Sequence, residues 1–275
     1  MDLPARWSEA DWDGSWLVIP DLHGHAARLN TALNSVQDFP ASRLVFLGDL
    51  IDDSPRRRLA RRAPPAPGMA DDSRRILETV RALVESGRAE VLLGNHEVMA
   101  AATVLDDHRP LMDLWWKVGG REAAASYGWD GRNSSPALMA DLRWLRDHAR
   151  LWLEIGLPGE QVLLSHATRP TPKRYASGLK RAGDLLPSDG EDDVVWFPLG
   201  LDSDNGARLN SLPLLPPGFV ASLHGHMETP GLWTLLDRED NPAYQLDVAP
   251  QRHTLALMEV SAEGQLTPHL AAIQE

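Results

Sequence analysis

The stretch VLLGNHEV, residues 91–98, is an apolar run that ends in glycine, asparagine, histidine and glutamate. Four other segments follow the same pattern, in which an apolar run of strand length is broken by Asp or His: WLVIPDLH at 16–23, LVFLGDLID at 44–52, VLLSH at 162–166 and FVASLHGH at 219–226. Continuous apolar runs are typical of strands that are buried on both faces of a sheet. The sequence therefore predicts five strands that end in side chains able to bind a ligand.

Helical patterns lie between several of these strands. HAARLNTALNSV at 25–36 is one, and DDSRRILETVRALVESG at 71–87 is another, with acidic residues in its first turn and Gly87 after its end. This alternation predicts an α/β sheet with right-handed crossovers, and binding sites in such sheets collect beyond the carboxyl ends of the strands. From about residue 151 onward the strand patterns are closer together and helices are few, which predicts a second, mixed sheet packed on the first.

Size and composition limit the possible functions. A chain of 275 residues with 43% hydrophobic residues can bury one substantial core, so we expect a single domain over residues 1–275. The net charge of −12 argues against a nucleic-acid partner, because binding to that backbone requires a basic face. The chain has no cysteine, so its possible metal ligands are His, Asp, Glu and Asn.

The N-terminal stretch MDLPARWSEADWDGSW lacks the charged leader and apolar run of a secretory signal. No segment approaches the length of a membrane span. We therefore expect a cytoplasmic protein without a membrane partner. The oligomeric state is not indicated by the sequence.

The strand ends supply a set of oxygen and nitrogen donors suited to divalent metals. On a strand, alternate side chains face the same way, so Asp21 and His23 can converge on one ion. Asp49 has two carboxylate oxygens and could bridge a pair of ions. Two divalent ions held by only two negative charges stay net positive, attract phosphate and provide a hydroxide nucleophile near neutral pH. The six predicted ligands are Asp21, His23, Asp49, Asn95, His166 and His226.

His96 is left over beside this set. Adjacent residues beyond a strand end point in different directions, so if Asn95 faces the metals, His96 can face the substrate and protonate the leaving group. Asp52 could accept a hydrogen bond from its imidazole, orient it and raise its pKa. Glu97 could hold the turn by binding backbone donors.

Each motif alone has an ordinary structural explanation. A D-x-H or G-D pair at a strand end is usually a turn or a helix cap, and a lone strand histidine is usually a satisfied interior residue. His224 is more easily explained in that second way than as a further ligand. The joint order of the motifs, however, favours a functional site.

These ordered motifs resemble those of the calcineurin-like metallophosphoesterases. They are most similar to the phosphoprotein phosphatase family and its bacterial relatives, which include serine/threonine phosphatases and symmetrical dinucleoside tetraphosphatases. The motifs are DLH at 21–23, GDLID at 48–52, GNHE at 94–97, SHA at 165–167 and GHMETP at 225–230, with weaker matches at WKVGG, 116–120, and QLDVA, 245–249. The resemblance covers about residues 15–260. It implies a four-layer αββα sandwich of two mixed sheets flanked by helices, a binuclear centre on the six ligands above, and His96 with Asp52 as the acid pair.

The chain departs from the family pattern at two phosphate-binding positions. GDLIDDSP has Asp53 where the family usually has arginine, and WFP has Pro198 in the place of a second arginine. Arg56 or Arg169 could bind phosphate instead. The arginine cluster at 56–68 is also well explained as a solvated loop.

Three functions are compatible with these features. The first is hydrolysis of phosphomonoesters, on a phosphoprotein or a small phosphorylated metabolite, by metal-activated hydroxide with two divalent ions; we favour Mn²⁺ over Fe or Zn²⁺. The second is a symmetrical dinucleoside polyphosphate hydrolase, in which the Trp-rich stretch 115–129 would stack a base, although Trp is more often core. The third is a weakly active or non-catalytic metal-binding protein, which has no need for both Asp52 and His96. The sequence does not choose between the first two.

Overall fold

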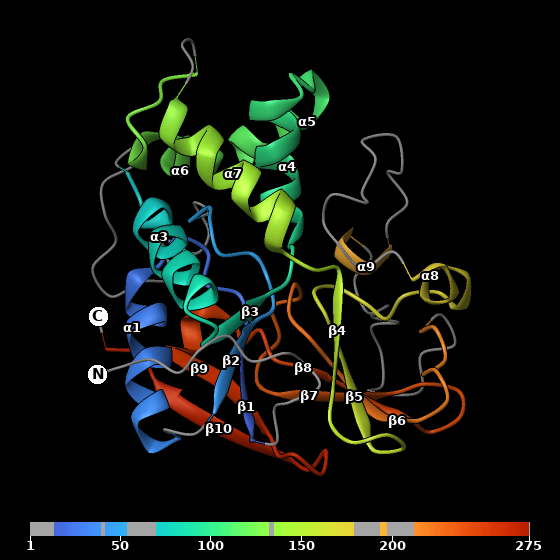
Figure 1. Ribbon diagram of the computed structural model, residues 1–275. Coiled ribbons are helices and arrows are strands. Elements are labelled where there is room, and N and C mark those ends of the chain that lie inside the picture. Colours follow the sequence, from blue (N-terminus) through green and yellow to red (C-terminus); the bar gives the residue numbers. More distant parts are fainter. Residues whose placement is uncertain are drawn as a thin grey trace.

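The computed structural model describes residues 14–39, 42–53, 70–131, 135–178, 193–196 and 212–274. Their strands form two five-stranded sheets (Figure 1). The first sheet has the order β10-β9-β1-β2-β3 and the second β4-β5-β6-β8-β7. Both sheets are mixed, and helices flank them, which confirms the predicted αββα sandwich.

In the first sheet, β1, β2 and β3 are parallel, and β9 pairs antiparallel with both β1 and β10. Its strands are β1 (Trp16–Ile19), β2 (Arg43–Phe46), β3 (Ala89–Val91), β9 (Thr254–Val260) and β10 (Leu266–Ala272). In the second sheet, β5, β6 and β8 are parallel, and β4 and β7 are the antiparallel edge strands. Its strands are β4 (Trp152–Ile155), β5 (Gln161–Ser165), β6 (Phe219–His224), β7 (Trp233–Leu236) and β8 (Pro242–Gln245).

Most of the helices lie between β1 and β4 in the chain. They are α1 (Ala26–Ser35), α3 (Ser73–Glu85), α4 (Asn95–Leu105), α5 (Arg109–Lys117), α6 (Gly120–Ser126) and α7 (Pro136–His148), with short 3-10 turns at Val36–Asp38 and Pro250–Arg252. Two short helices, α8 (Pro172–Ser177) and α9 (Asp193–Trp196), accompany the second sheet (Figure 1). None of the described helices is long and apolar enough to cross a bilayer.

Alternation along the strands builds the core. In β1, Trp16 and Val18 face the second sheet and join an apolar cluster with its residues Val162 and Leu164. The intervening Leu17 and Ile19 belong to the other cluster, which lies beneath the helices. This period of two is what a strand covered on both faces requires.

Three segments differ from the sequence expectations. The strand expected at the start of the stretch 91–98 is β3, which begins earlier, at Ala89, and already ends at Val91. The helix α4 then begins at Asn95. The C-terminal strands β9 and β10 join the first sheet instead of extending the second, because β9 covers the free edge of β1, with Trp16 opposite Val260. The Pro- and Gly-rich stretch 170–193 is expected from its composition to be a surface loop, but the structure describes the helix α8 within it. Residues 179–192, like the arginine cluster at 56–68, lie outside the described residues.

Candidate active site

The six predicted ligands meet at the carboxyl ends of five strands. Asp21 and His23 follow β1, and Asp49 follows β2, while Asn95 is the first residue of α4, just beyond β3. The second sheet contributes the other two, because His166 follows β5 and His226 follows β6. The two sheets therefore share one polar site at the same edge of the sandwich.

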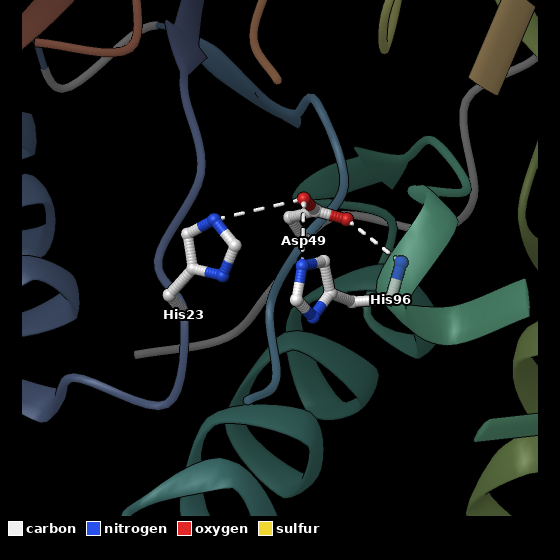
Figure 2. A group of neighbouring side chains, drawn as sticks. All are labelled: His23, Asp49 and His96. Carbon is white, nitrogen blue, oxygen red and sulfur yellow. Dashed lines mark hydrogen bonds and ion pairs between the residues drawn. The ribbon is translucent and has the colours of Figure 1, made fainter. Parts of the chain in front are cut away.

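The carboxylate of Asp49 lies close to the rings of both His23 and His96 (Figure 2). One of its carboxylate oxygens, Oδ2, lies 3.6 Å from Nε2 of His23, which in turn lies 3.6 Å from Oδ2 of Asp21. The other oxygen, Oδ1, lies 3.3 Å from Nε2 of His166. A carboxylate whose two oxygens face two different imidazoles has the arrangement that a bridge between two ions requires.

A second group of donors gathers around the side-chain amide of Asn95. Its Oδ1 lies 3.1 Å from Nε2 of His166 and 2.9 Å from Nδ1 of His226. Asp49, His166 and His226 have ligand atoms within 4.8 Å of one another. An ion bound by this group would therefore have ligands from both sheets. The other group, Asp21, His23 and Asp49, follows strands of the first sheet only.

The hydrogen bonds of His166 show that this donor set fits a cation. Its Nδ1 lies 2.9 Å from the backbone oxygen of Leu47, and a carbonyl oxygen can only accept, so Nδ1 carries the hydrogen. In the neutral ring, Nε2 then has a lone pair directed at oxygens of Asn95 and Asp49. Lone pairs that face each other repel unless a proton or a metal ion lies between them. A metal-bound histidine typically donates its other nitrogen to a carbonyl or carboxylate in this manner.

The pKa values of the buried groups also favour a cation at this site. Burial alone would raise the pKa of Asp49, but the imidazoles of His166, His96 and His23 hold it well below its usual range. Burial would lower the pKa of His166, but Asp49 raises it to about 9. Burial, together with His166, lowers the pKa of His226 to about 4, which leaves that imidazole neutral and able to bind metal at neutral pH.

The backbone of the site is strained. Among the described residues other than glycine, seven have a positive φ, and four of them lie here: His23 at 47°, Asp49 at 47°, Asp52 at 72° and His226 at 71°. This left-handed conformation costs a residue with a side chain about 1–3 kcal/mol and tends to cluster at functional sites. The surrounding contacts must hold these side chains in place.

Glu97 provides one such contact, as predicted for the turn. Its carboxylate accepts hydrogen bonds from the backbone amides of Asp49, Leu50, Ile51 and Gly94 at 2.8–3.2 Å. It thereby ties the loop after β2 to the start of α4. A Cβ at Gly94 would overlap Asp49, so only glycine allows this close approach.

A buried ion pair supports the other side of the site. Arg28 on α1 donates from Nε to the backbone oxygen of Asp21 at 2.9 Å and from Nη2 to Oδ1 of Asp247 at 3.1 Å. The sequence comparison singled out the stretch QLDVA around Asp247 but did not predict this role. The available signal was an arginine on the apolar face of a helix, which needs a buried acidic partner.

His96 and Asp52 form the predicted pair. Nδ1 of His96 lies 2.8 Å from Oδ2 of Asp52, and its Nε2 lies 3.8 Å from Oδ2 of Asp49, so the ring connects the orienting carboxylate to the centre. Burial would lower the pKa of His96, but Asp49 and Asp52 raise it to about 9. Burial raises the pKa of Asp52 to about 7, and its hydrogen bond with His96 opposes this rise.

A further contact with Asp52 was not predicted. The indole Nε1 of Trp115, a fully buried residue of α5, donates to Oδ2 of Asp52 at 2.7 Å. The sequence suggested that the Trp-rich stretch would either stack a base or fill the core. Trp115 does belong to the core, and its polar atom also reaches the carboxylate that is paired with His96.

The proposed phosphate contacts are placed differently from expectation. Arg169 is fully buried, and its five N–H donors are engaged by Ser222, Asp237 and the backbone oxygens of Pro213, Asn241 and Pro242. Its guanidinium is therefore part of the interior of the second sheet and has no donor left for a substrate. Arg56 lies outside the described residues.

His224 is an interior strand residue. Its Nδ1 lies 3.1 Å from the hydroxyl of Ser165 and its Nε2 lies 2.8 Å from that of Ser222. Burial, and next to it the charge of Arg169, lowers its pKa to about 3. Both ring nitrogens thus have protein partners, and the residue is not available as a further ligand.

Comparisons with known proteins agree with this geometry. Residues 15–227 match the profile of the calcineurin-like phosphoesterase family. No curated protein sequence matches the chain significantly. Similar solved structures include a candidate diadenosine tetraphosphatase (TM-score 0.51, 17% identity, 96% of each chain) and a serine/threonine phosphatase from Saccharomyces cerevisiae (0.55, 13%, 97% of this chain and 82% of that one).

A third similar structure is a metallophosphoesterase from Sphaerobacter thermophilus, with a TM-score of 0.51, 14% identity and coverage of 95% of this chain and 89% of that one. At these identities the three structures support the fold alone. The family profile spans most of the chain and includes all six predicted ligands. The chain therefore belongs to the calcineurin-like phosphoesterase family and is a metal-dependent hydrolase of phosphoric esters.

Proposed function

We propose that this protein hydrolyses phosphomonoesters, carried by a phosphoprotein or by a small phosphorylated metabolite, with His96 as the general acid. The main support for this proposal is the position of the His96 ring, which lies between Asp52 and the carboxylate of Asp49, a proposed ligand, with one nitrogen directed at each. A histidine and an aspartate that only stabilised the fold would not need to lie beside six side chains of the types that bind metals.

The proposed ligands suit two divalent ions. They combine carboxylate and amide oxygens with imidazole nitrogens and contain no thiolate, which favours Mn²⁺ among the metals that accept this mixture. When bound, the ions would lower the pKa of a water molecule and neutralise charge on the phosphate. The residues in question are Asp21, His23, Asp49, Asn95, His166 and His226.

His96 would supply the proton that the leaving group needs. Because the carboxylate of Asp52 accepts from Nδ1, the second proton of the imidazolium is on Nε2, which faces the centre. The hydrogen bond and the charge of Asp52 raise the pKa of His96 and favour the protonated ring. Transfer to the departing oxygen prevents the build-up of an unstable alkoxide.

Substrate binding would depend mainly on the charge of the centre, since Arg169 is committed to the interior. Arg56 is kept as the proposed phosphate contact on sequence grounds alone. The alternative substrate, a dinucleoside polyphosphate, gains no support from the tryptophans. Trp115 is buried, and Trp116 and Trp129 stack on it with ring centroids 5.2 and 6.2 Å away.

The proposal is tested by assaying the purified protein with Mn²⁺ against p-nitrophenyl phosphate, a phosphoserine peptide and diadenosine tetraphosphate. We expect turnover of the two monoesters with kcat/KM well above that for the dinucleotide. Exclusive cleavage of the dinucleotide would establish the alternative function. Tight binding of two ions without turnover of any of the three substrates would indicate a metal-binding protein.

A further inference from the structure

One oxygen of Asp52 receives two hydrogen bonds. Oδ2 lies 2.8 Å from Nδ1 of His96 and 2.7 Å from the indole Nε1 of Trp115. An indole nitrogen can only donate, so the direction of the second bond is fixed. The carboxylate is fully buried, and its backbone amide is anchored on the hydroxyl of Ser73 at 3.0 Å. Asp52 is thus restrained both at its backbone and at the oxygen that orients His96.

The indole itself is held tightly. Trp115 is fully buried and stacks on Trp116 with an interplanar angle of 20° and on Trp129 with one of 29°. On another side, a Cβ at Gly120 would lie 2.5 Å from the Trp115 ring, so the first residue of α6 must be glycine for the helix to approach so closely. The stretch WKVGG therefore ends in the residue that leaves room for the indole.

A buried tryptophan does not need this bond in order to pack. The indole nitrogen of Trp144, which is also buried, has no hydrogen-bond partner within the described part of the chain. The fold therefore tolerates an indole without a partner, whereas that of Trp115 is directed at the carboxylate beside the catalytic histidine. An N–H donor on a carboxylate also stabilises its ionised form, which is the form that orients an imidazole.

We propose that Trp115 is a positioning residue for the general acid, acting through Asp52 to fix the orientation of His96. This inference rests on the proposed function of His96. The hydrogen bond of the Trp115 indole goes to Asp52, so an effect on the reaction would pass through His96. Its loss should impair proton donation and leave metal binding intact.

The test compares Trp115→Phe with Trp116→Phe as a matched control. Both substitutions shorten an aromatic side chain in the same stack, but only the first removes the donor to Asp52. For Trp115→Phe we expect kcat on an alkyl phosphate to fall by about tenfold, the typical effect of one lost hydrogen bond to a charged group. Hydrolysis of p-nitrophenyl phosphate, whose leaving group needs little protonation, should change by less than about twofold. KM and bound metal should stay unchanged, and Trp116→Phe should leave the alkyl-to-aryl ratio as it is.

Gly120→Ala provides a second variant if Trp115→Phe does not fold. It keeps the indole but displaces it from its position against Asp52, because the added Cβ would overlap the Trp115 ring, and we expect the same selective loss on the alkyl substrate. In a His96→Ala background, neither change should reduce the alkyl rate further, because the group that they position is absent.

The outcomes separate this inference from the proposed function. If His96→Ala impairs alkyl esters selectively and neither Trp115→Phe nor Gly120→Ala does so, the inference about Trp115 is wrong and the general acid stands. Equal losses of Trp115→Phe on both substrates, with metal loss, would also overturn it by showing a purely structural role. If His96→Ala leaves the alkyl-to-aryl ratio unchanged, the proposed acid is wrong and the inference falls with it.

Discussion

At the centre of the site, the carboxylate of Asp49 lies close to proposed ligands from both sheets and to His96. Its oxygens face His23 at 3.6 Å and His166 at 3.3 Å, and the backbone amide of His96 donates to Oδ1 at 3.1 Å. The same carboxylate therefore lies between the proposed ligands of both sheets and binds the start of α4. No other described residue connects the two groups of donors and the acid in this way.

Asp49→Asn tests the proposed bridge. The amide offers one acceptor oxygen in place of two and has no charge, so we expect at least one ion to bind about 100-fold more weakly or worse. Metal content after gel filtration, measured by mass spectrometry, and titration calorimetry would show the change. Two tightly bound ions together with full activity would mean that Asp49 does not bridge.

His96→Ala tests the acid through the chemistry of the leaving group. Hydrolysis of alkyl phosphates should fall by roughly 10²–10⁴-fold, because their alkoxide leaving groups need a proton. Aryl phosphates should be affected much less, and both metals should remain bound. Asp52→Asn should act in the same direction but more mildly, since the imidazole is still present. An equal loss on both substrates with loss of metal would instead make His96 a support of the metal centre.

Residue types and their order were sufficient to predict which side chains gather at the site. The motif GNHE, for example, predicted that Asn95 and His96 would point apart and that Glu97 would bind backbone amides. Contacts made by residues outside these motifs were not predictable in this way. Trp115 and Asp52 are 63 residues apart, and nothing in the local sequence distinguishes an indole that meets a carboxylate from one that only fills the core. Arg169 was misplaced because a guanidinium binds a buried carboxylate as well as it binds phosphate.

At the level of elements, the positions of the strands were easier to predict from the sequence than the way in which the strands pair. β1, β2, β5 and β6 are short apolar runs ending in polar residues, and each was found where predicted. β9 has an apolar pattern that fits either sheet, so its pairing with β1 depends on which edge is free once the whole chain has folded. β10 was not predicted, because most of its residues are exposed or half-buried at the edge of the sheet and it lacks a continuous apolar run.

The pair formed by Arg169 and Asp237 links the loop after β5 to the turn between β7 and β8. We expect Arg169→Met to lower the free energy of unfolding by about 3–5 kcal/mol, because it leaves a buried carboxylate without its partner. Urea denaturation measures this loss, and KM of the folded fraction should stay the same. An unchanged stability with a raised KM would return Arg169 to the role of a phosphate contact.

The same pair has a defined dependence on pH. Burial would raise the pKa of Asp237, but hydrogen bonds from Asn241, Glu239 and Arg169 outweigh it and lower the pKa to about 2. Because the folded pKa lies below the unfolded value of about 3.9, this stabilisation is fully present above about pH 4 and is lost as the pH falls toward 2. Arg169→Met should therefore reduce the steepness of acid unfolding in that interval.

On the scale of the whole molecule, the proposed metal centre joins the two sheets. Four of its ligands follow strands of the first sheet, and His166 and His226 follow strands of the second. Between the sheets lies a shared apolar layer in which Val18 and Val45 join Val162 and Leu164. Bound metal should therefore stabilise the packing of one sheet on the other.

Metal removal tests this coupling and the proposed single domain together. With Mn²⁺ at about 100 times its Kd, each bound ion should add about 2.7 kcal/mol to the stability of the folded state. For a chain of this size that corresponds to a rise in Tm of roughly 5 °C per ion over the EDTA-treated protein. Calorimetry should show one cooperative transition in each case. An unchanged Tm would contradict the proposed coupling between metal binding and sheet packing. Two separate transitions would contradict the single domain.

The division of the ligands between the sheets has a consequence for synthesis of the protein. As the chain is made, Asp21, His23 and Asp49 emerge early, and Asn95 follows them well before His166 and His226. The donor group that both sheets share, Asp49, His166 and His226, stays incomplete until residue 226 has left the ribosome and the second sheet has packed on the first. The number of ions that a newly made molecule binds would then show whether its two sheets have packed together correctly.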